Sequence, residues 1–298
     1  MKSPETRPRA VHDPKGPPPY QNLHIYYVDG LPRFDLRSLG EDFIGNWEED
    51  GCSFLFFKKP AESQVDRLLA LEPALQLLDR FQMTYEEWQG GKVTTYVAGR
   101  LVIAPPWETP RIDAGSEATL IRLDPGVVFG TGMHATTRDC LAALELACTQ
   151  ETYERALDLG TGSGLLALAA AKLGCRRVLA VDLNPLAVRT ARDNVRLNRL
   201  AHRMLAVQGK AEEFVDMNAD LLIANIHYEI MARLIASAGF LKKRRFILSG
   251  LMRSQAAAVA GQLRRMPVTL LQTWEQEGTW TTIFGRVDAI ADGRGTSG

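Results

Sequence analysis

A glycine-rich turn limits what this chain can fold into more than any other feature of its sequence. Residues 158–164 read DLGTGSG, between an apolar run at residues 156–159 and a helical stretch that begins near Gly164. Glycines at alternate positions let the backbone approach a ligand where side chains would obstruct it. Units of strand, glycine turn and helix bind nucleotides in parallel α/β sheets. The turn therefore predicts an α/β domain with a nucleotide-type ligand where its first strand ends.

Short apolar runs alternate with longer helical stretches from residue 155 onward, which predicts a doubly wound, mostly parallel sheet. The predicted helices begin near Gly164, Pro185, Tyr228 and Ser254. The last two strands follow each other through Gly278 without a helix, so we expect an antiparallel hairpin there. The predicted strands lie at residues 156–159, 177–182, 204–208, 221–225, 246–249, 268–274 and 280–286.

A chain of 298 residues has room for a second, smaller domain before this sheet. Strand-like runs at residues 24–28 and 52–57, with helical spacing over residues 63–78, predict an α+β domain. We expect a proline-rich disordered leader at 1–20, the small domain at 21–90, a linker at 91–117, the main domain at 118–290 and a flexible tail at 291–298. The linker is expected to contain one short strand near residues 100–103.

The bulk composition is typical of a globular protein of the cytoplasm. The 35 basic and 35 acidic residues balance, so no overall field attracts nucleic acid or a membrane surface. No stretch approaches the ~20 apolar residues that span a bilayer. The four cysteines lack C-x-x-C spacing, which predicts reduced thiols and no metal site. We therefore expect a cytoplasmic protein with no direct nucleic-acid partner and no membrane partner.

The glycine turn alone is compatible with two classes of cofactor. Residues 162–167 also fit the dinucleotide pattern G-x-G-x-x-A, and Asp182 ends the next strand, where both classes hold ribose hydroxyls. Asp158 separates the two classes, because a carboxylate there repels a pyrophosphate but attracts the ammonium of a bound methionine group. This favours S-adenosylmethionine over a dinucleotide.

Two further motifs carry a family resemblance. Residues 129–137 read FGTGMHATT, and residues 220–226 read DLLIANI. Together with the glycine turn they resemble the PrmA family, the ribosomal protein methyltransferases that modify lysines and the N-terminal amine of a large-subunit protein. The similarity runs from about residue 88 to residue 286. It implies a seven-stranded, Rossmann-like methyltransferase sheet, S-adenosylmethionine as cofactor and a protein substrate recognised by the amino-terminal domain.

The resemblance also implies roles for individual residues. Residues 129–131 form a loop over the methionine end of the cofactor, and Thr136 or Thr137 caps the following helix. Asn225 ends the fourth strand beside the donor methyl, as the catalytic residue whose amide oxygen accepts a hydrogen bond from the incoming amine. His134 is expected to pack as a structural histidine near the helix start. The predicted cofactor-binding residues are Phe129, Gly130, Thr131, Asp158, Gly160, Gly162, Gly164, Asp182, Ala211 and Asn225.

The chain departs from the family pattern in two places. Ala135 stands where proline is usual, and His227 and Tyr228 stand where the family commonly continues with leucine. The second departure puts two polar aromatic side chains near the expected substrate mouth. We therefore expect methyl transfer to an amine, with a protein lysine as first choice. The alternatives are another protein or a small-molecule amine as acceptor, as in relatives that modify electron-transfer flavoprotein, or cofactor binding without catalysis.

Overall fold

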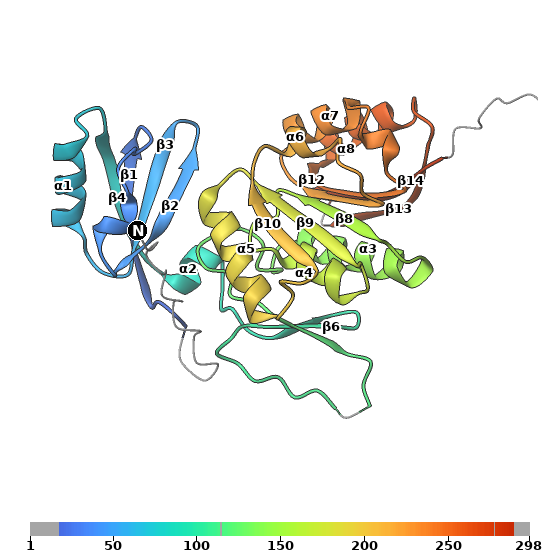
Figure 1. Ribbon diagram of the computed structural model, residues 1–298, viewed down its shortest axis with the longest axis horizontal. Helices are drawn as coiled ribbons and strands as arrows, with labels where there is room; N and C mark the ends of the chain where they lie inside the picture. Colours follow the sequence, from blue (N-terminus) through green and yellow to red (C-terminus); the bar gives the residue numbers. More distant parts are fainter. Residues whose placement is uncertain (1–17, 114, 277, 289–298) are drawn as a thin grey trace, which may run out of the picture.

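The computed structural model describes residues 18–113, 115–276 and 278–288 (Figure 1). The predicted flexible tail lies outside the described residues, and so does the predicted leader apart from residues 18–20. Within the described part of the chain, none of the helices combines the length and the apolar character needed to cross a membrane.

A seven-stranded sheet in the order β10-β9-β8-β11-β12-β14-β13 forms the centre of the larger domain. All neighbours pair in parallel except β14, which runs antiparallel to β12 and β13. The predicted fold class and the predicted hairpin are confirmed. The strands are β8 (Arg155–Leu159), β9 (Arg177–Asp182), β10 (Met204–Gln208), β11 (Leu221–Asn225), β12 (Arg245–Met252), β13 (Val268–Gln276) and β14 (Trp280–Val287).

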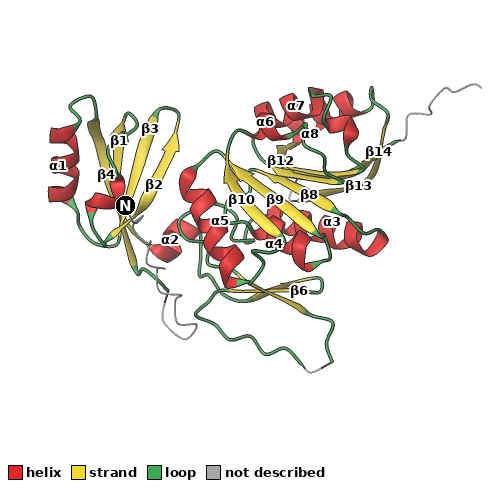
Figure 2. Cartoon of the chain, in the orientation of Figure 1, coloured by secondary structure: helices red, strands yellow, loops and turns green. Residues whose placement is uncertain are grey.

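Helices cover both faces of this sheet (Figure 2). Because successive side chains of a strand point to opposite faces, β11 supplies both cores. Ile223 packs with residues of the first group of helices, and Leu222 packs with residues of the second. The first group is α3 (Ala135–Gln150), α4 (Leu165–Lys172) and α5 (Pro185–Leu197), and the second is α6 (Ala211–Phe214), α7 (Tyr228–Ala236) and α8 (Arg253–Leu263), with the 3-10 helix η2 (Phe240–Lys242).

The connections leave β8 and β11 in opposite directions across the sheet. From β8 the chain proceeds outward to β9 and β10, whereas β11 is followed by β12 on its other side. The two strands are direct neighbours, with Ala224 paired to Leu159. A ligand crevice forms beyond the carboxyl ends of parallel strands at such a reversal. The fold therefore brings the glycine turn after β8 next to Asn225 at the end of β11.

The amino-terminal domain is a four-stranded antiparallel sheet in the order β2-β3-β1-β4. The helix expected over residues 63–78 is wrong beyond residue 71, because Pro73 prevents its continuation and the chain turns into a strand at Gln76. This strand carries mostly exposed side chains, so it lacks the alternation by which a strand is predicted. The elements are β1 (Asn22–Asp29), η1 (Leu36–Leu39), β2 (Phe43–Glu49), β3 (Cys52–Phe57), α1 (Glu62–Leu71), β4 (Gln76–Thr84) and α2 (Tyr85–Gln89).

Both faces of the amino-terminal sheet are covered. Leu55 and Phe57 pack against α1, whereas Phe56 belongs to a cluster that includes Val128 and Leu186 of the larger domain. Hydrogen bonds add to this apolar contact: Asn184 Nδ2 donates to the Glu48 carbonyl at 3.5 Å, and the Arg189 guanidinium donates to the Ile44 carbonyl. The small sheet is thus attached at the start of α5.

The expected linker at 91–117 contains β5 (Tyr96–Ala98) as well as the expected strand, β6 (Leu101–Ala104). Together with β7 (Thr119–Arg122), which follows the linker, they form a three-stranded sheet in which β6 and β7 run parallel. Ile103 and Ile121 are buried in the core beneath α3 and α4. This segment therefore belongs to the packed body of the larger domain.

We predict that the packing of α1 stabilises the amino-terminal sheet. Leu68 is fully buried, whereas Leu71 of the same helix is 55% exposed. Leu68→Ala should lower the free energy of unfolding by about 2–5 kcal/mol, because it leaves a cavity, while Leu71→Ala should change it by less than about 1 kcal/mol. Urea denaturation measures both. Equal losses for the two variants would contradict this packing.

Candidate functional site

A cavity of about 620 Å³ lies beyond the carboxyl ends of the parallel strands. The structure brings most of the predicted binding residues to its wall. Gly130 and Thr131 instead line a neighbouring cavity, and Asp158 and Gly164 line neither. The predicted residues on the wall are Phe129, Gly160, Gly162, Asp182, Ala211 and Asn225.

The backbone amides of the glycine turn are all used inside the protein. None of the five N–H groups from Gly160 to Gly164 remains to bind a ligand, since each donates to an oxygen of this chain. The acceptors are the Val181 carbonyl for Gly160 (2.8 Å) and Thr161 (3.0 Å), Asp182 Oδ2 for Gly162 (2.9 Å), the Phe129 carbonyl for Ser163 (2.9 Å) and the Thr161 carbonyl for Gly164 (2.9 Å).

The loop of residues 129–131 lies directly on this turn. Ser163 Oγ donates to the Gly130 carbonyl at 2.6 Å, beside the backbone bond from Ser163 to Phe129. Gly162 has a φ of +54°, and a Cβ at this position would lie 2.5 Å from the Phe129 carbonyl oxygen. Only glycine fits such a left-handed position against another backbone. The glycines therefore let the backbone of the turn lie close to the protein's own loop as well as to the cavity.

A buried asparagine that was not predicted fixes the chain at Asp124, five residues before this loop. Asn194 in α5 accepts from the Asp124 N–H and donates to the Asp124 carbonyl, both at 2.8 Å. Its Nδ2 also donates to the Ser163 carbonyl at 2.9 Å. Asn194 is 1% exposed, so these bonds are shielded from water, and they join the segment before the loop, the glycine turn and α5.

Asp182 at the end of β9 is held by two backbone groups. Its Oδ2 accepts from Gly162 and its Oδ1 accepts from Asn184, both at 2.9 Å. Burial raises the pKa of this carboxyl above its ordinary value, while the backbone donors oppose the rise. Each carboxylate oxygen has a second lone pair, so the group can still accept hydrogen bonds from ligand hydroxyls.

Asp158 lies behind the cavity wall with 1% of its surface exposed. Thr161 Oγ1 donates to its Oδ2 at 2.6 Å, whereas its Oδ1 accepts no hydrogen bond of ordinary length from any described residue. Burial, with a smaller contribution from the Asp182 charge, raises the pKa of Asp158 to about 7. A cation in the cavity would favour the ionised form through its field, even without direct contact.

Asn225 and the start of α3 meet on the wall of the same cavity. The helix is capped by His134, whose Nδ1 accepts from the Thr136 N–H at 3.4 Å. The predicted cap by Thr136 or Thr137 is therefore wrong, because both threonines lie inside the first helical turn. Thr136 Oγ1 lies 2.7 Å from His134 Nδ1 and accepts from Asn225 Nδ2 at 3.3 Å. The side chain of His134 thus both caps the helix and contacts the site.

Several residues of the wall could not be found by reading the sequence. Trp47 comes from the amino-terminal sheet, and Trp280 from β14 packs edge-on against the His134 ring at 5.0 Å between ring centroids. Arg233 lies on the same wall in an ion pair with Glu212 at 2.8 Å. No local pattern marks Trp47, Trp280 or Arg233, because only the folded sheet order brings them to the cavity. Glu212 differs, because it follows the strand at residues 204–208, where a binding residue is expected.

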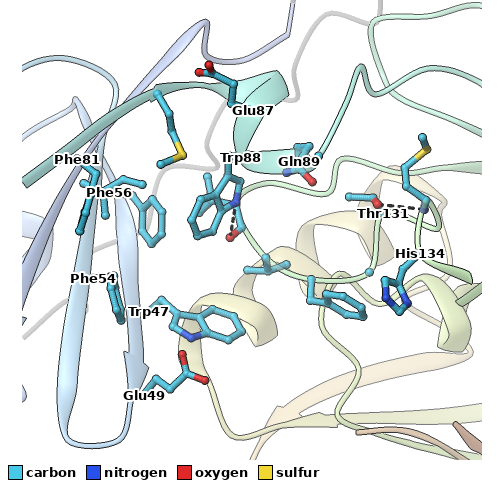
Figure 3. Close-up of a pocket in the computed structure, with 18 residues that line it drawn as sticks. Trp47, Glu49, Phe54, Phe56, Phe81, Glu87, Trp88, Gln89, Thr131 and His134 are labelled. Carbon is cyan, nitrogen blue, oxygen red and sulfur yellow. Dashed lines mark hydrogen bonds between the residues drawn. The ribbon is translucent and has the colours of Figure 1, made fainter. Parts of the chain in front are cut away.

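A second cavity of about 810 Å³ separates the amino-terminal sheet from the loop that leads to His134. Figure 3 shows aromatic side chains of the small domain on one side, with Thr131 and His134 on the other. Trp47, Phe129 and His134 line both cavities, so the two adjoin. The aromatic residues on the side of the small domain are Trp47, Phe54, Phe56, Phe81 and Trp88.

The comparisons with known proteins agree with one another. A family model described as ribosomal protein L11 methyltransferase (PrmA) matches residues 75–288. The ribosomal protein L11 methyltransferase of Exiguobacterium sibiricum is 30% identical over 291 residues, which covers 88% of this chain and 90% of the relative. That of Geobacillus thermodenitrificans is 39% identical over 180 residues, covering 58% of this chain and 57% of the relative.

A solved structure resembles the fold. The crystal structure of ribosomal protein L11 methylase from Lactobacillus delbrueckii subsp. bulgaricus superposes with a TM-score of 0.57 at 29% sequence identity. The match covers 66% of this chain and 100% of that one. In several of these relatives the match with this chain covers less than two thirds of the relative's own length, between 57% and 66%.

We predict that Asp158 makes stability depend on pH. Its pKa is about 7 in the folded protein, against about 3.9 in an unfolded chain, so between these values only the folded state keeps the proton. Its contribution to stability is complete below pH ~4 and is lost as the pH rises through 7. Asp158→Asn removes this titration, and its unfolding free energy relative to wild type should rise by about 2–3 kcal/mol between pH ~5 and ~8. Urea denaturation at both pH values tests this, and a constant difference would contradict it.

Proposed function

The chain belongs to the PrmA family of ribosomal protein methyltransferases, and we propose that it transfers methyl groups from S-adenosylmethionine to amines of a ribosomal protein, chiefly lysine. The observation that carries this proposal is the meeting of the glycine turn, Asp182 and Asn225 around one cavity. The proposal places the chain in the cytoplasm, with a free ribosomal protein related to L11 as its partner.

The cavity suits an adenosyl ligand in size and chemistry. Its volume of about 620 Å³ lies within the range of small-molecule sites. Asp182 would bind the ribose hydroxyls, while Ala211 and the 61% exposed Leu183 would lie against the adenine. Residues 129–131 would cover the methionine end, above the buried carboxyl of Asp158. These assignments follow the family resemblance and the chemistry of the wall.

The hydrogen bonds of the turn argue against the dinucleotide alternative. A pyrophosphate on such a turn is bound by free backbone N–H groups and by the positive end of the following helix. Here the N–H groups from Gly160 to Gly164 already donate to oxygens of this chain. The carboxyl groups of Asp158 and Asp182 would also repel a phosphate. A sulfonium ligand with an ammonium group does not need free backbone N–H groups, and the two carboxyl groups attract its positive charge.

We propose that Asn225 orients the acceptor amine of the substrate. When bound, S-adenosylmethionine supplies an activated methyl group on a positively charged sulfur. The lysine arrives as a neutral amine, having lost its proton to solvent, and Asn225 accepts a hydrogen bond from one of its N–H groups. The nitrogen lone pair forms the new N–C bond as the C–S bond breaks, S-adenosylhomocysteine leaves, and a second proton is released to water. Alignment is the main contribution of the protein.

The aromatic cavity is proposed to admit the acceptor segment. Four large apolar side chains on its wall are unusually exposed: Phe81 at 41%, Trp88 at 38%, Phe129 at 53% and Met133 at 39%. A contiguous exposed apolar surface of this kind marks a site of contact with another molecule. Because this cavity adjoins the one that holds Asn225, a segment bound to the amino-terminal sheet could extend a lysine toward the donor.

A methyl-transfer assay tests the acceptor. The purified protein is incubated with methyl-labelled S-adenosylmethionine and either a free L11-type ribosomal protein, lysine as a small amine, or a cell lysate. We expect the label on lysines of the ribosomal protein, identified by mass spectrometry, and none on free lysine. Exclusive labelling of another lysate protein would replace the proposed acceptor, and absence of all transfer would contradict catalysis.

We predict that the contact between the turn and the loop is needed for cofactor binding. Gly162→Ala should weaken S-adenosylhomocysteine binding by about tenfold or more, since the added Cβ forces the loop of Phe129 away. Gly174→Ala is the matched control, because Gly174 also has a positive φ of +116° but no atom of the described residues lies within 4 Å of an added Cβ. Titration calorimetry measures both variants. Equal affinities for the two would show that the contact is unimportant for binding.

A further inference from the structure

Three side chains at the cavity form a continuous chain of hydrogen bonds. Asn225 at the end of β11 contacts Thr136 in the first turn of α3, and Thr136 contacts the capping residue His134. The heavy-atom distances are 3.3 Å from Asn225 Nδ2 to Thr136 Oγ1 and 2.7 Å from Thr136 Oγ1 to His134 Nδ1. The positions of the hydrogen atoms on these three side chains determine which end of the Asn225 amide faces the cavity.

The helix cap favours one tautomer of His134. The backbone N–H of Thr136 can only donate, and its 3.4 Å contact with His134 Nδ1 favours the tautomer in which this nitrogen carries no proton. The ring lies half-buried between Phe129 and Trp280, with centroid distances of 5.7 and 5.0 Å. Burial lowers the pKa of His134, which keeps the ring neutral. A neutral ring with a bare Nδ1 has its proton on Nε2.

The tautomer then determines the direction of the remaining bonds. Because His134 Nδ1 has no proton, the 2.7 Å contact requires the hydroxyl of Thr136 to be the donor. The hydroxyl has only one proton, so toward Asn225 it can offer only a lone pair. Asn225 must therefore present its Nδ2 to Thr136. The opposite orientation of the amide would set two oxygen lone pairs against each other.

We propose that His134 and Thr136 are positioning residues that hold the Asn225 amide with its Oδ1, and not its Nδ2, toward the incoming amine. This rests on the proposed methyl transfer. An amide oxygen accepts an N–H of the amine and leaves the nitrogen lone pair free for the methyl group, whereas an amide NH₂ would donate to that lone pair and block attack.

The surroundings of Asn225 leave its oxygen free for this role. No described residue donates a hydrogen bond to Oδ1, and this oxygen is not fully buried. Gly250 lies alongside, where an added Cβ would come within 3.0 Å of Oδ1 and 2.9 Å of the Ile226 carbonyl oxygen. The absence of a side chain at Gly250 keeps the cavity open beside the oxygen.

Two substitutions at Thr136 test the role of the hydroxyl. Thr136→Val keeps the shape but removes both hydrogen bonds, so kcat should fall about tenfold with little change in the KM for S-adenosylmethionine. Thr136→Ser restores the hydroxyl and should recover most of the rate. Thr137→Val is the matched control, because the neighbouring Thr137 Oγ1 is buried and has no hydrogen-bond partner among the described residues. An unchanged kcat in Thr136→Val, or a Thr136→Ser variant as slow as it, would overturn the proposal.

A spectroscopic measurement tests the hydrogen-bond chain without catalysis. The ¹⁵N shifts of the His134 ring, assigned among the five histidines by the loss of its signals in His134→Asn, should be those of a neutral ring protonated on Nε2. A proton on Nδ1 would reverse the hydroxyl and refute the proposal. Since this readout needs no acceptor, a wild-type protein with the expected tautomer but no methyl transfer would count against the proposed function alone. Thermal melting of each variant confirms folding.

Discussion

The backbone contact between the glycine turn and the loop of residues 129–131 is the constraint on which the rest of the site depends. Ser163 donates to Phe129, and Gly162 lies so close to the Phe129 carbonyl that no Cβ fits between them. Asn194 joins the same turn to Asp124, five residues before the loop. Val128, directly before the loop, packs with the amino-terminal sheet, and the loop leads on to His134 at the start of α3. One contact thus connects the cavity wall, the small domain and the helix beside Asn225.

The same contact changes what the turn can bind. Its amides are satisfied within the chain, so they offer little to an anionic phosphate. We propose that recognition then depends on carboxyl groups and apolar surfaces: Asp182 and Ala211 on the cavity wall, and Asp158 behind it. The raised pKa of Asp158 limits the cost of burying this group while the cavity holds no cation. A positively charged adenosyl ligand suits such a site better than a dinucleotide.

The sequence predicts those parts of the structure that local patterns encode. The strands of the large sheet are apolar runs bounded by turns, and β9, β10 and β11 were predicted with the boundaries that the structure has. β4 was missed because its exposed side chains show no alternation. The cap of α3 was misassigned because threonine is a commoner cap than histidine. Asn194 and Trp47 could not be predicted as site residues, because their contacts join segments that only the fold brings together.

Titration calorimetry of the intact protein with S-adenosylmethionine and, separately, with NAD tests the nature of the ligand most directly. We expect saturable binding of S-adenosylmethionine at one site per chain and no measurable heat from NAD, because the N–H groups from Gly160 to Gly164 already donate within the chain. Binding of NAD with no binding of S-adenosylmethionine would contradict this expectation, and the cavity would then have to be assigned to a dinucleotide.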